Sequence, residues 1–209
     1  MKSKLFLALT LAVAIPAMPV MANQNVINGL DFGPLAKLVG QWESVKTGGV
    51  DVSPAQQGSG QEAGSPAVTP FYEKMTFEVA ADAVNASDQK LVAMYYKQEV
   101  FRKSDDSKFH DQRGYLIYDA TNQVVYNSVC VPRTTCVTAE SPAGDNMTFT
   151  SSKRGIAESD YMLKNASTTT FSMTLNISDD SLTYSQVTGL KIYGKDISHT
   201  DSGKLVKVK

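Results

Sequence analysis

The chain has 209 residues, of which 42% are hydrophobic and 20% charged, and its formal net charge is −1. These values are typical of a globular protein with one domain, and they lie far from the composition of a disordered chain. So weak a charge argues against a nucleic-acid partner and against strong attraction to an anionic membrane.

The first 22 residues have the pattern of a secretory signal peptide. Lys2 and Lys4 precede the apolar run Leu5–Ile15, and small residues end at Ala22. The run is too short for a spanning helix, so no integral membrane segment is expected after cleavage. The mature domain is then 23–209, with 18 basic and 21 acidic residues, because the two lysines are lost. We expect it in the periplasm or secreted.

A short helix is predicted next, just before the only tryptophan of the chain. Pro34 fits the first helical position, Leu35 starts an apolar face, and Gly40 ends the turn before Trp42. A helix of this length can close one end of a barrel, with the tryptophan entering its floor. An ordinary surface helix before an ordinary strand is the alternative.

Residues 47–69 form a composition break, rich in Gly, Ser, Pro, Ala and Gln. Such a segment buries too little apolar surface to offset its ordering entropy, so we expect a long flexible loop. It could cover a cavity mouth or be an insertion without a role.

The rest of the chain reads as short strands separated by turn residues, with no pattern of alternating helices and strands. In Phe71–Val79 the apolar positions alternate with polar ones, which is typical of a strand with one buried face. About ten such strands predict an all-β fold, an antiparallel up-and-down β-barrel with the short N-terminal helix as a plug. The expected strands are Phe71–Val79, Leu91–Phe101, Phe109–Tyr118, Gln123–Cys130, Thr135–Glu140, Asn146–Ser152, Tyr161–Leu163, Thr168–Ile177, Ser181–Gln186, Lys191–Ile197 and Leu205–Val208.

The two cysteines, Cys130 and Cys136, enclose five residues at the tip of an expected hairpin. An oxidising compartment favours a disulfide between them. A redox or zinc role is the weaker interpretation, because the spacing is not C-x-x-C and two thiolates are too few for a structural zinc site.

The two histidines, His110 and His199, both lie at predicted strand ends, where barrel side chains reach the mouth. Neither has a second His or Cys at a metal-ligand spacing, which argues against zinc. One neutral imidazole in an apolar cavity is sufficient to ligate a haem iron. A surface or hydrogen-bonding histidine is the commoner alternative.

The sequence resembles the nitrobindin-type haem-binding β-barrels. The segment Gly33–Trp42 reads G-P-L-A-K-L-V-G-Q-W, His110 opens the motif H-x-x-x-G-Y-L, and His199 precedes the C-terminal strand. The resemblance spans essentially the whole mature chain and implies a ten-stranded barrel that holds haem b near one mouth. It implies that His199 is the iron ligand and that His110 and Trp42 lie at the haem. The acidic residue two places after the first histidine is Gln112 here, which weakens the expectation of a hydrogen-bonding role.

Two functions remain open at this stage. The first, implied by the resemblance, is binding of nitric oxide or isomerisation of peroxynitrite at a His199-ligated ferric haem. Only the isomerisation would make the protein an enzyme. The second is a lipocalin-like carrier of a small apolar ligand without haem or catalysis. A filled barrel that serves only as an interaction module is a third possibility. Whether the cavity is open depends on strand register, because a one-residue slip exchanges the inward and outward side chains.

Overall fold

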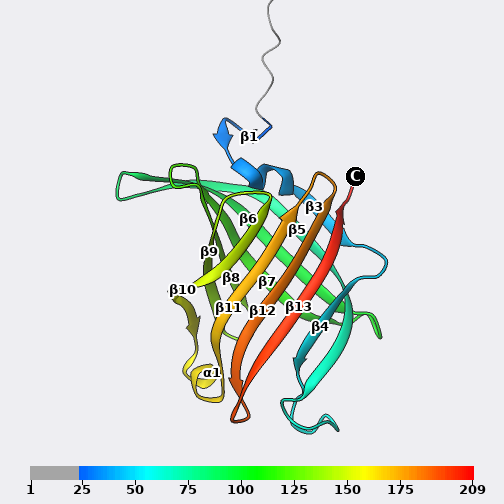
Figure 1. Ribbon diagram of the computed structural model, residues 1–209. Coiled ribbons are helices and arrows are strands. Elements are labelled where there is room, and N and C mark those ends of the chain that lie inside the picture. The colour runs from blue at the N-terminus through cyan, green and yellow to red at the C-terminus, as the bar shows by residue number, and fades with distance from the viewer. Residues whose placement is uncertain (1–23) are drawn as a thin grey trace, which may run out of the picture.

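The computed structural model describes residues 24–209, and the predicted signal peptide, residues 1–22, lies outside this part of the chain. The described chain is almost entirely β, with antiparallel strands that wrap into a barrel (Figure 1). The predicted fold class is therefore confirmed. No helix in the described part of the chain has the length and apolar character needed to cross a membrane.

The elements follow one another along the chain with short connections. In order they are β1 (Val26–Ile27), β2 (Leu30–Asp31), the 3-10 helix η1 (Gly33–Leu38), β3 (Gly40–Ser44), β4 (Gly49–Pro54), β5 (Pro66–Asn85), β6 (Gln89–Arg102), β7 (Lys108–Asp119), β8 (Val124–Val131), β9 (Thr135–Pro142), β10 (Asn146–Glu158), α1 (Asp160–Asn165), β11 (Ala166–Ile177), β12 (Ser181–Ile192) and β13 (Lys195–Lys207).

The barrel wall is a ring of ten strands, in the order β12, β11, β10, β9, β8, β7, β6, β5, β3 and β13, and β13 pairs back onto β12. The predicted number of strands is confirmed for this ring. Strand β4 pairs with β5 and β13, which are also the two neighbours of β3. Strands β3 and β4 therefore occupy the same place in the wall, one at each end of the barrel.

The prediction of a flexible loop over residues 47–69 is wrong for much of that segment. Gly49–Pro54 forms β4, and β5 already begins at Pro66, so the irregular part is residues 55–65. Composition misled the prediction because it ignores backbone pairing. The two long strands on either side of β4 satisfy its backbone N–H and C=O groups.

The predicted strand at Tyr161–Leu163 is also wrong, because these residues lie in the helix α1 (Asp160–Asn165). Ser159 caps this helix, since its side-chain oxygen accepts a hydrogen bond from the backbone N–H of Met162. The tyrosine and the leucine are exposed, so their apolar character did not indicate a buried strand.

The short helix η1 closes one end of the barrel, as predicted. Pro34 is the second residue of this helix, and Leu35 and Leu38 are fully buried against the core. Trp42 is also fully buried, and its indole Nε1 donates a 2.7 Å hydrogen bond to the carbonyl oxygen of Leu38. The apolar core continues from η1 into the barrel, where the inward positions of β5 alternate as predicted through Phe71, Glu73, Met75 and Phe77.

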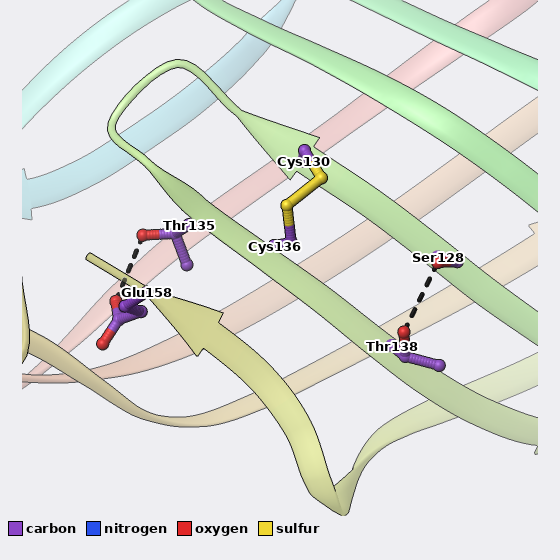
Figure 2. Close-up of a disulfide and its surroundings, with 6 residues drawn as sticks. All are labelled: Ser128, Cys130, Thr135, Cys136, Thr138 and Glu158. Carbon is purple, nitrogen blue, oxygen red and sulfur yellow. Dashed lines mark hydrogen bonds between the residues drawn. A yellow bond between two sulfur atoms is a disulfide. The ribbon is translucent and has the colours of Figure 1, made fainter.

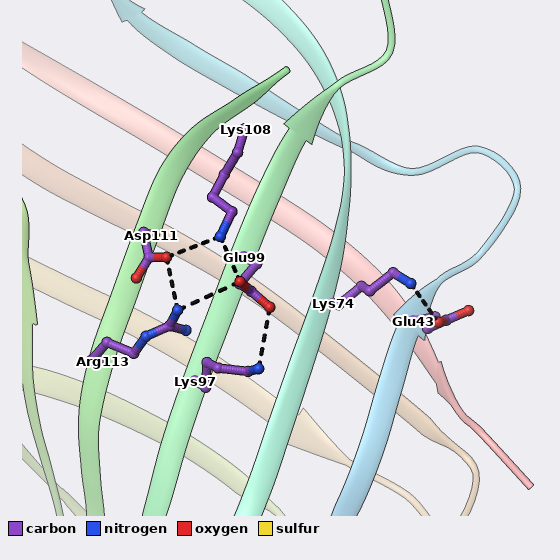
Figure 3. A network of polar contacts seen from close by, with 7 residues as sticks. All are labelled: Glu43, Lys74, Lys97, Glu99, Lys108, Asp111 and Arg113. Atoms are coloured by element: carbon purple, nitrogen blue, oxygen red, sulfur yellow. Dashed lines mark hydrogen bonds and ion pairs between the residues drawn. The ribbon is translucent and has the colours of Figure 1, made fainter. Parts of the chain in front are cut away.

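The outer face of β6 and β7 carries a network of charges (Figure 3). Glu99 contacts Lys97, Lys108 and Arg113, and the two cations on β7 also contact Asp111. The hydrogen bond from Lys108, with help from Lys97, lowers the pKa of Glu99 to about 2. This wall is thus polar outside, and its inner face is left to form the core and a cavity.

Candidate functional site

An open cavity of about 280 Å³ lies at the end of the barrel away from η1. Strand β7 shows the separation, because Phe109 lines the cavity whereas Tyr118, further along the strand, packs against Gly33 of η1. Both histidines of the chain, His110 and His199, line the cavity. A neighbouring space of about 80 Å³ is also lined by both, so the two spaces form one depression.

The imidazole of His199 lies between two carboxylates. Its Nε2 is 2.6 Å from Oδ2 of Asp51 and 3.4 Å from Oδ1 of Asp201. Side chains alternate along a strand, so β13 presents His199 and Asp201 on the same face. The register of β4 against β13 places Asp51 opposite Asp201. Asp51 is only 5% exposed, so this cluster is part of the cavity wall and not of the outer surface.

The two carboxylates set the charge of His199. Burial disfavours the imidazolium, but the hydrogen bonds to Asp201 and Asp51 outweigh burial and raise the pKa of His199 to about 9. Burial alone would raise the pKa of Asp51, yet the contact with His199 lowers it. Burial raises the pKa of Asp201. At neutral pH the side chain of His199 is therefore a cation paired with an ionised Asp51.

A chain of hydrogen bonds runs from the cavity into the barrel, starting at Gln112, which lines the cavity with His110. Gln112 Nε2 donates to the hydroxyl of Tyr96 at 3.2 Å. Tyr96 donates in turn to Oε1 of Gln98 at 2.7 Å, and Gln98 Nε2 donates to Oε2 of Glu73 at 2.5 Å. Gln112 therefore takes part in hydrogen bonding although it is not acidic, and its amide N–H group donates to Tyr96, which an ionised carboxylate could not do.

Burial lowers the pKa of His110, so this imidazole is neutral at pH 7. The cavity therefore holds one neutral and one positively charged histidine. A neutral imidazole is a hydrogen-bond acceptor or metal ligand, whereas an imidazolium must first lose a proton.

Glu73 is a buried acid below the cavity floor. It is 1% exposed, its Oε2 accepts from Gln98 and Tyr184, and its Oε1 has no partner among the described residues. Burial raises the pKa of Glu73 to about 7. A side chain at Gly203 would collide with Glu73 Oε1, so only glycine leaves room there. Together with the amides and the two tyrosine hydroxyls, Glu73 forms a polar layer between the apolar core and the cavity.

The predicted disulfide is present between Cys130 and Cys136, which face each other across the β8–β9 hairpin (Figure 2). It closes the loop that carries Arg133, and the guanidinium-bearing side chain of Arg133 lines the cavity. On the inner side of the hairpin, Thr135 donates a 3.1 Å hydrogen bond to Glu158 of β10. The disulfide therefore fixes a loop that presents a positive charge at the cavity mouth.

The structure brings two of the three predicted cofactor-binding residues together. His110 and His199 share the cavity, but Trp42 lies under η1 at the closed end and does not line it. Sequence reasoning missed Asp201, although its position two residues after His199 on one strand would have indicated a shared face. It also missed Asp51, which lies in the segment expected to be a loop.

Comparison with known proteins gives one matching family and two similar solved structures. The family model described as the THAP4-like, heme-binding beta-barrel domain matches residues 31–207. The crystal structure of Rv2717c from M. tuberculosis aligns with a TM-score of 0.58 and 16% identity over 84% of this chain and 95% of that chain. The S-type phycobiliprotein lyase CPES from Guillardia theta aligns with a TM-score of 0.49 and 9% identity over 83% and 89%. No curated protein sequence matches.

Proposed function

The chain belongs to the THAP4-like haem-binding β-barrel family, as the resemblance to nitrobindin-type barrels predicted, and on this basis we propose that it binds one haem b in the open cavity. In this proposal His199 is the protein ligand to the iron. The observation that carries it is the position of the His199 imidazole on the cavity wall, beside His110 and at the end of the barrel that the plug leaves open.

The surroundings of His199 favour its role as a haem ligand in one respect and restrict which ring nitrogen can bind the iron. Histidines that ligate metals usually have a carboxylate partner that orients the ring, and Asp51 is in place for this. Both carboxylate contacts are made by Nε2, so ligation uses Nδ1 or requires Nε2 to leave Asp51. Because the pKa of His199 is about 9, binding near neutral pH must also release a proton.

The cavity walls offer apolar contact to a flat ring. Val129, Val137 and Phe171 line the smaller space, and Phe71 and Phe109 line the larger one. The cavity is near the lower end of the range of about 300–1,000 Å³ for ligand sites. We therefore expect a porphyrin to fill the depression and to extend from its mouth.

Two arginines at the mouth suit the carboxylate groups of haem. Arg102 and Arg133 both line the cavity, and Arg102 is held by a 3.1 Å hydrogen bond to Ser107 and by its position 4.5 Å above the ring of Phe109. Guanidinium groups pair well with carboxylates. Electrostatic attraction would therefore orient the propionates toward the mouth.

The finer proposal is that the protein binds nitric oxide or isomerises peroxynitrite to nitrate. A bound ferric haem would supply the reactive iron, while the protein would hold it, limit water and place His110 in the same cavity. The neutral His110 is able to accept a hydrogen bond from a small ligand. The alternative of a carrier for an apolar ligand is less favoured, because Gln98, Gln112 and Tyr184 line the cavity with polar groups.

Titration of the purified protein with haem tests the proposal. We expect saturation at one equivalent and a Soret band that shifts or collapses in His199→Ala. The matched control is Asp196→Asn, an exposed position on the same strand, which should bind as the unsubstituted protein does. An unchanged spectrum in His199→Ala would contradict the ligand assignment.

We also propose that the protein acts outside the cytoplasm. The signal-peptide pattern of residues 1–22 and the disulfide between Cys130 and Cys136 support this location. N-terminal sequencing of protein recovered from the periplasm or the medium should begin at Asn23. Recovery of the full-length chain only from the cytoplasm would contradict it.

A further inference from the structure

The side chains around His199 are also suited to bind a metal ion without haem. One ligand atom from each of Asp51, His199 and Asp201 lies within 4.8 Å of the others. The three residues come from two adjacent paired strands, β4 and β13, and not from a loop. Strand pairing therefore holds three candidate metal ligands together.

We propose that Asp51, His199 and Asp201 form a binding site for one divalent transition-metal cation of the zinc class, and that this cation and haem compete for His199. One imidazole and two carboxylates suit cations such as Zn²⁺, whereas Mg²⁺ and Ca²⁺ prefer oxygen ligands alone. The cluster offers three protein ligands and lies beside an open cavity. Zinc sites that keep a fourth position for water have the same arrangement.

The distances are close to those that such a cation needs. Ligand atoms at 2.0–2.2 Å from a tetrahedral Zn²⁺ lie about 3.4 Å from one another. The separation between His199 Nε2 and Asp201 Oδ1 is already 3.4 Å. Asp51 Oδ2, at 2.6 Å from Nε2, has to retreat by less than about 1 Å, which a small side-chain rotation supplies.

The charges of the cluster also favour a dication. Two carboxylates face one imidazole, so at most one positive charge balances two negative ones. No lysine or arginine makes an ion pair with Asp51 or Asp201 in the described part of the chain. A dication bound to the neutral imidazole and both carboxylates would leave the cluster with no net charge, which reduces the cost of keeping it within the cavity wall.

A neighbouring side chain holds one of the two carboxylates in place. Gln186 Nε2 donates to Oδ2 of Asp201 at 3.3 Å. Partners of this kind orient metal ligands and are part of the affinity of a site. Cysteine does not compete, since both cysteines of the chain form the disulfide.

Calorimetric titration of the full protein, free of haem and of any affinity tag, tests the inference with Zn²⁺ and, separately, with Mg²⁺. We expect one equivalent of Zn²⁺ and no comparable binding of Mg²⁺. Loss of a direct ligand in His199→Ala or Asp201→Asn should weaken Zn²⁺ binding by more than about 100-fold, the upper effect of losing an outer partner. Asp196→Asn, at an exposed position on the same strand as His199, should leave the affinity unchanged.

NMR of the unsubstituted protein keeps the inference testable if a variant does not fold. The chain has two histidines, so each gives an assignable ring signal. Zn²⁺ should shift the signals of His199 directly, and haem added afterwards should displace the cation. Absence of Zn²⁺ binding, equal binding in His199→Ala, or shifts confined to His110 would overturn the inference.

Cation binding and haem binding have separate readouts, so either can fail alone. Zn²⁺ binding without a Soret change would leave the cation site and remove the proposed haem function. Haem binding to His199 without Zn²⁺ binding would support the proposed haem function and overturn the cation site.

Discussion

Replacing Glu73 with glutamine should change how stability depends on pH. The carboxyl group of Glu73 is buried, and its pKa in the folded protein is raised from 4.5 to about 7. The folded state therefore keeps a proton that the unfolded chain releases, so stability falls as pH rises through this interval. At roughly 1.4 kcal/mol per pKa unit, the ionised group destabilises the folded protein by about 3 kcal/mol above the folded pKa.

Glutamine has the same shape and cannot ionise. Its oxygen can still accept from Gln98 and Tyr184, and its amide nitrogen takes the position of Oε1, which has no partner among the described residues. Between about pH 5 and about pH 8, the original protein should lose on the order of 2–3 kcal/mol of unfolding free energy relative to the variant. At a typical slope of about 2 kcal/mol per molar urea, the midpoints should separate by about 1 M.

Urea unfolding followed by the fluorescence of Trp42, which is fully buried, measures this difference. Other titrating groups occur in both proteins and cancel in the comparison. Glu78→Gln is the matched control, because Glu78 is an exposed residue on the same strand and should show no such change. Parallel pH profiles for Glu73→Gln and the original protein would refute the reasoning that burial of this carboxylate costs stability.

The remaining predictions concern other parts of the barrel. Replacing Cys130 and Cys136 together with serine should lower the unfolding free energy by about 2 kcal/mol, the chain-entropy value for so short a loop, and an unchanged urea midpoint would contradict this. Leu35→Ala should cost about 3 kcal/mol, because the side chain is fully buried in the plug, and a loss below about 1 kcal/mol would show that the plug does not pack on the core. Asp51→Asn should lower the pKa of His199 from about 9 toward its ordinary value, and an NMR titration that shows no change would contradict the pairing.

The fold could be predicted from local patterns because each strand carries its own signal. Alternation through Phe77 and its neighbours on β5, the Pro34–Gly40 helix signal and the two-cysteine hairpin are all readable within a few residues. The order of the strands in the ring is also simple, because strands that follow one another in the chain are neighbours from β5 to β13. Local information was therefore sufficient for the wall of the barrel.

The site was only partly predictable because its contacts are distant in sequence. The motif indicated His199, but its partner Asp51 is 148 positions away and comes to it through the pairing of β4 with β13. The polar layer depends on register in the same way, since Glu73 meets Gln98 and Tyr184 only when three strands are aligned. A one-residue slip of any of them would remove the contacts, and register is not readable from one strand alone.

The break between β3 and β4 explains how an acidic residue comes to face His199. In β3 the inward side chain is Trp42, at an even position, and its neighbour Glu43 points outward to Lys74 (Figure 3). In β4 the inward side chain is Asp51, at an odd position, so the inward parity changes across the break. An unbroken strand would have turned Asp51 to solvent.

Two glycines permit this change of parity. Gly48 has a positive φ of 67°, and its backbone N–H bonds the carbonyl of Val45 at 2.7 Å, which tightens the connection. At Gly49 a side chain would collide with the ring of Phe71, a cavity-lining residue. The short connection between β3 and β4 therefore changes which side chains of this part of the wall point inward, and it also packs against the cavity. The position of Asp51 beside His199 is a consequence of this local break in the strand.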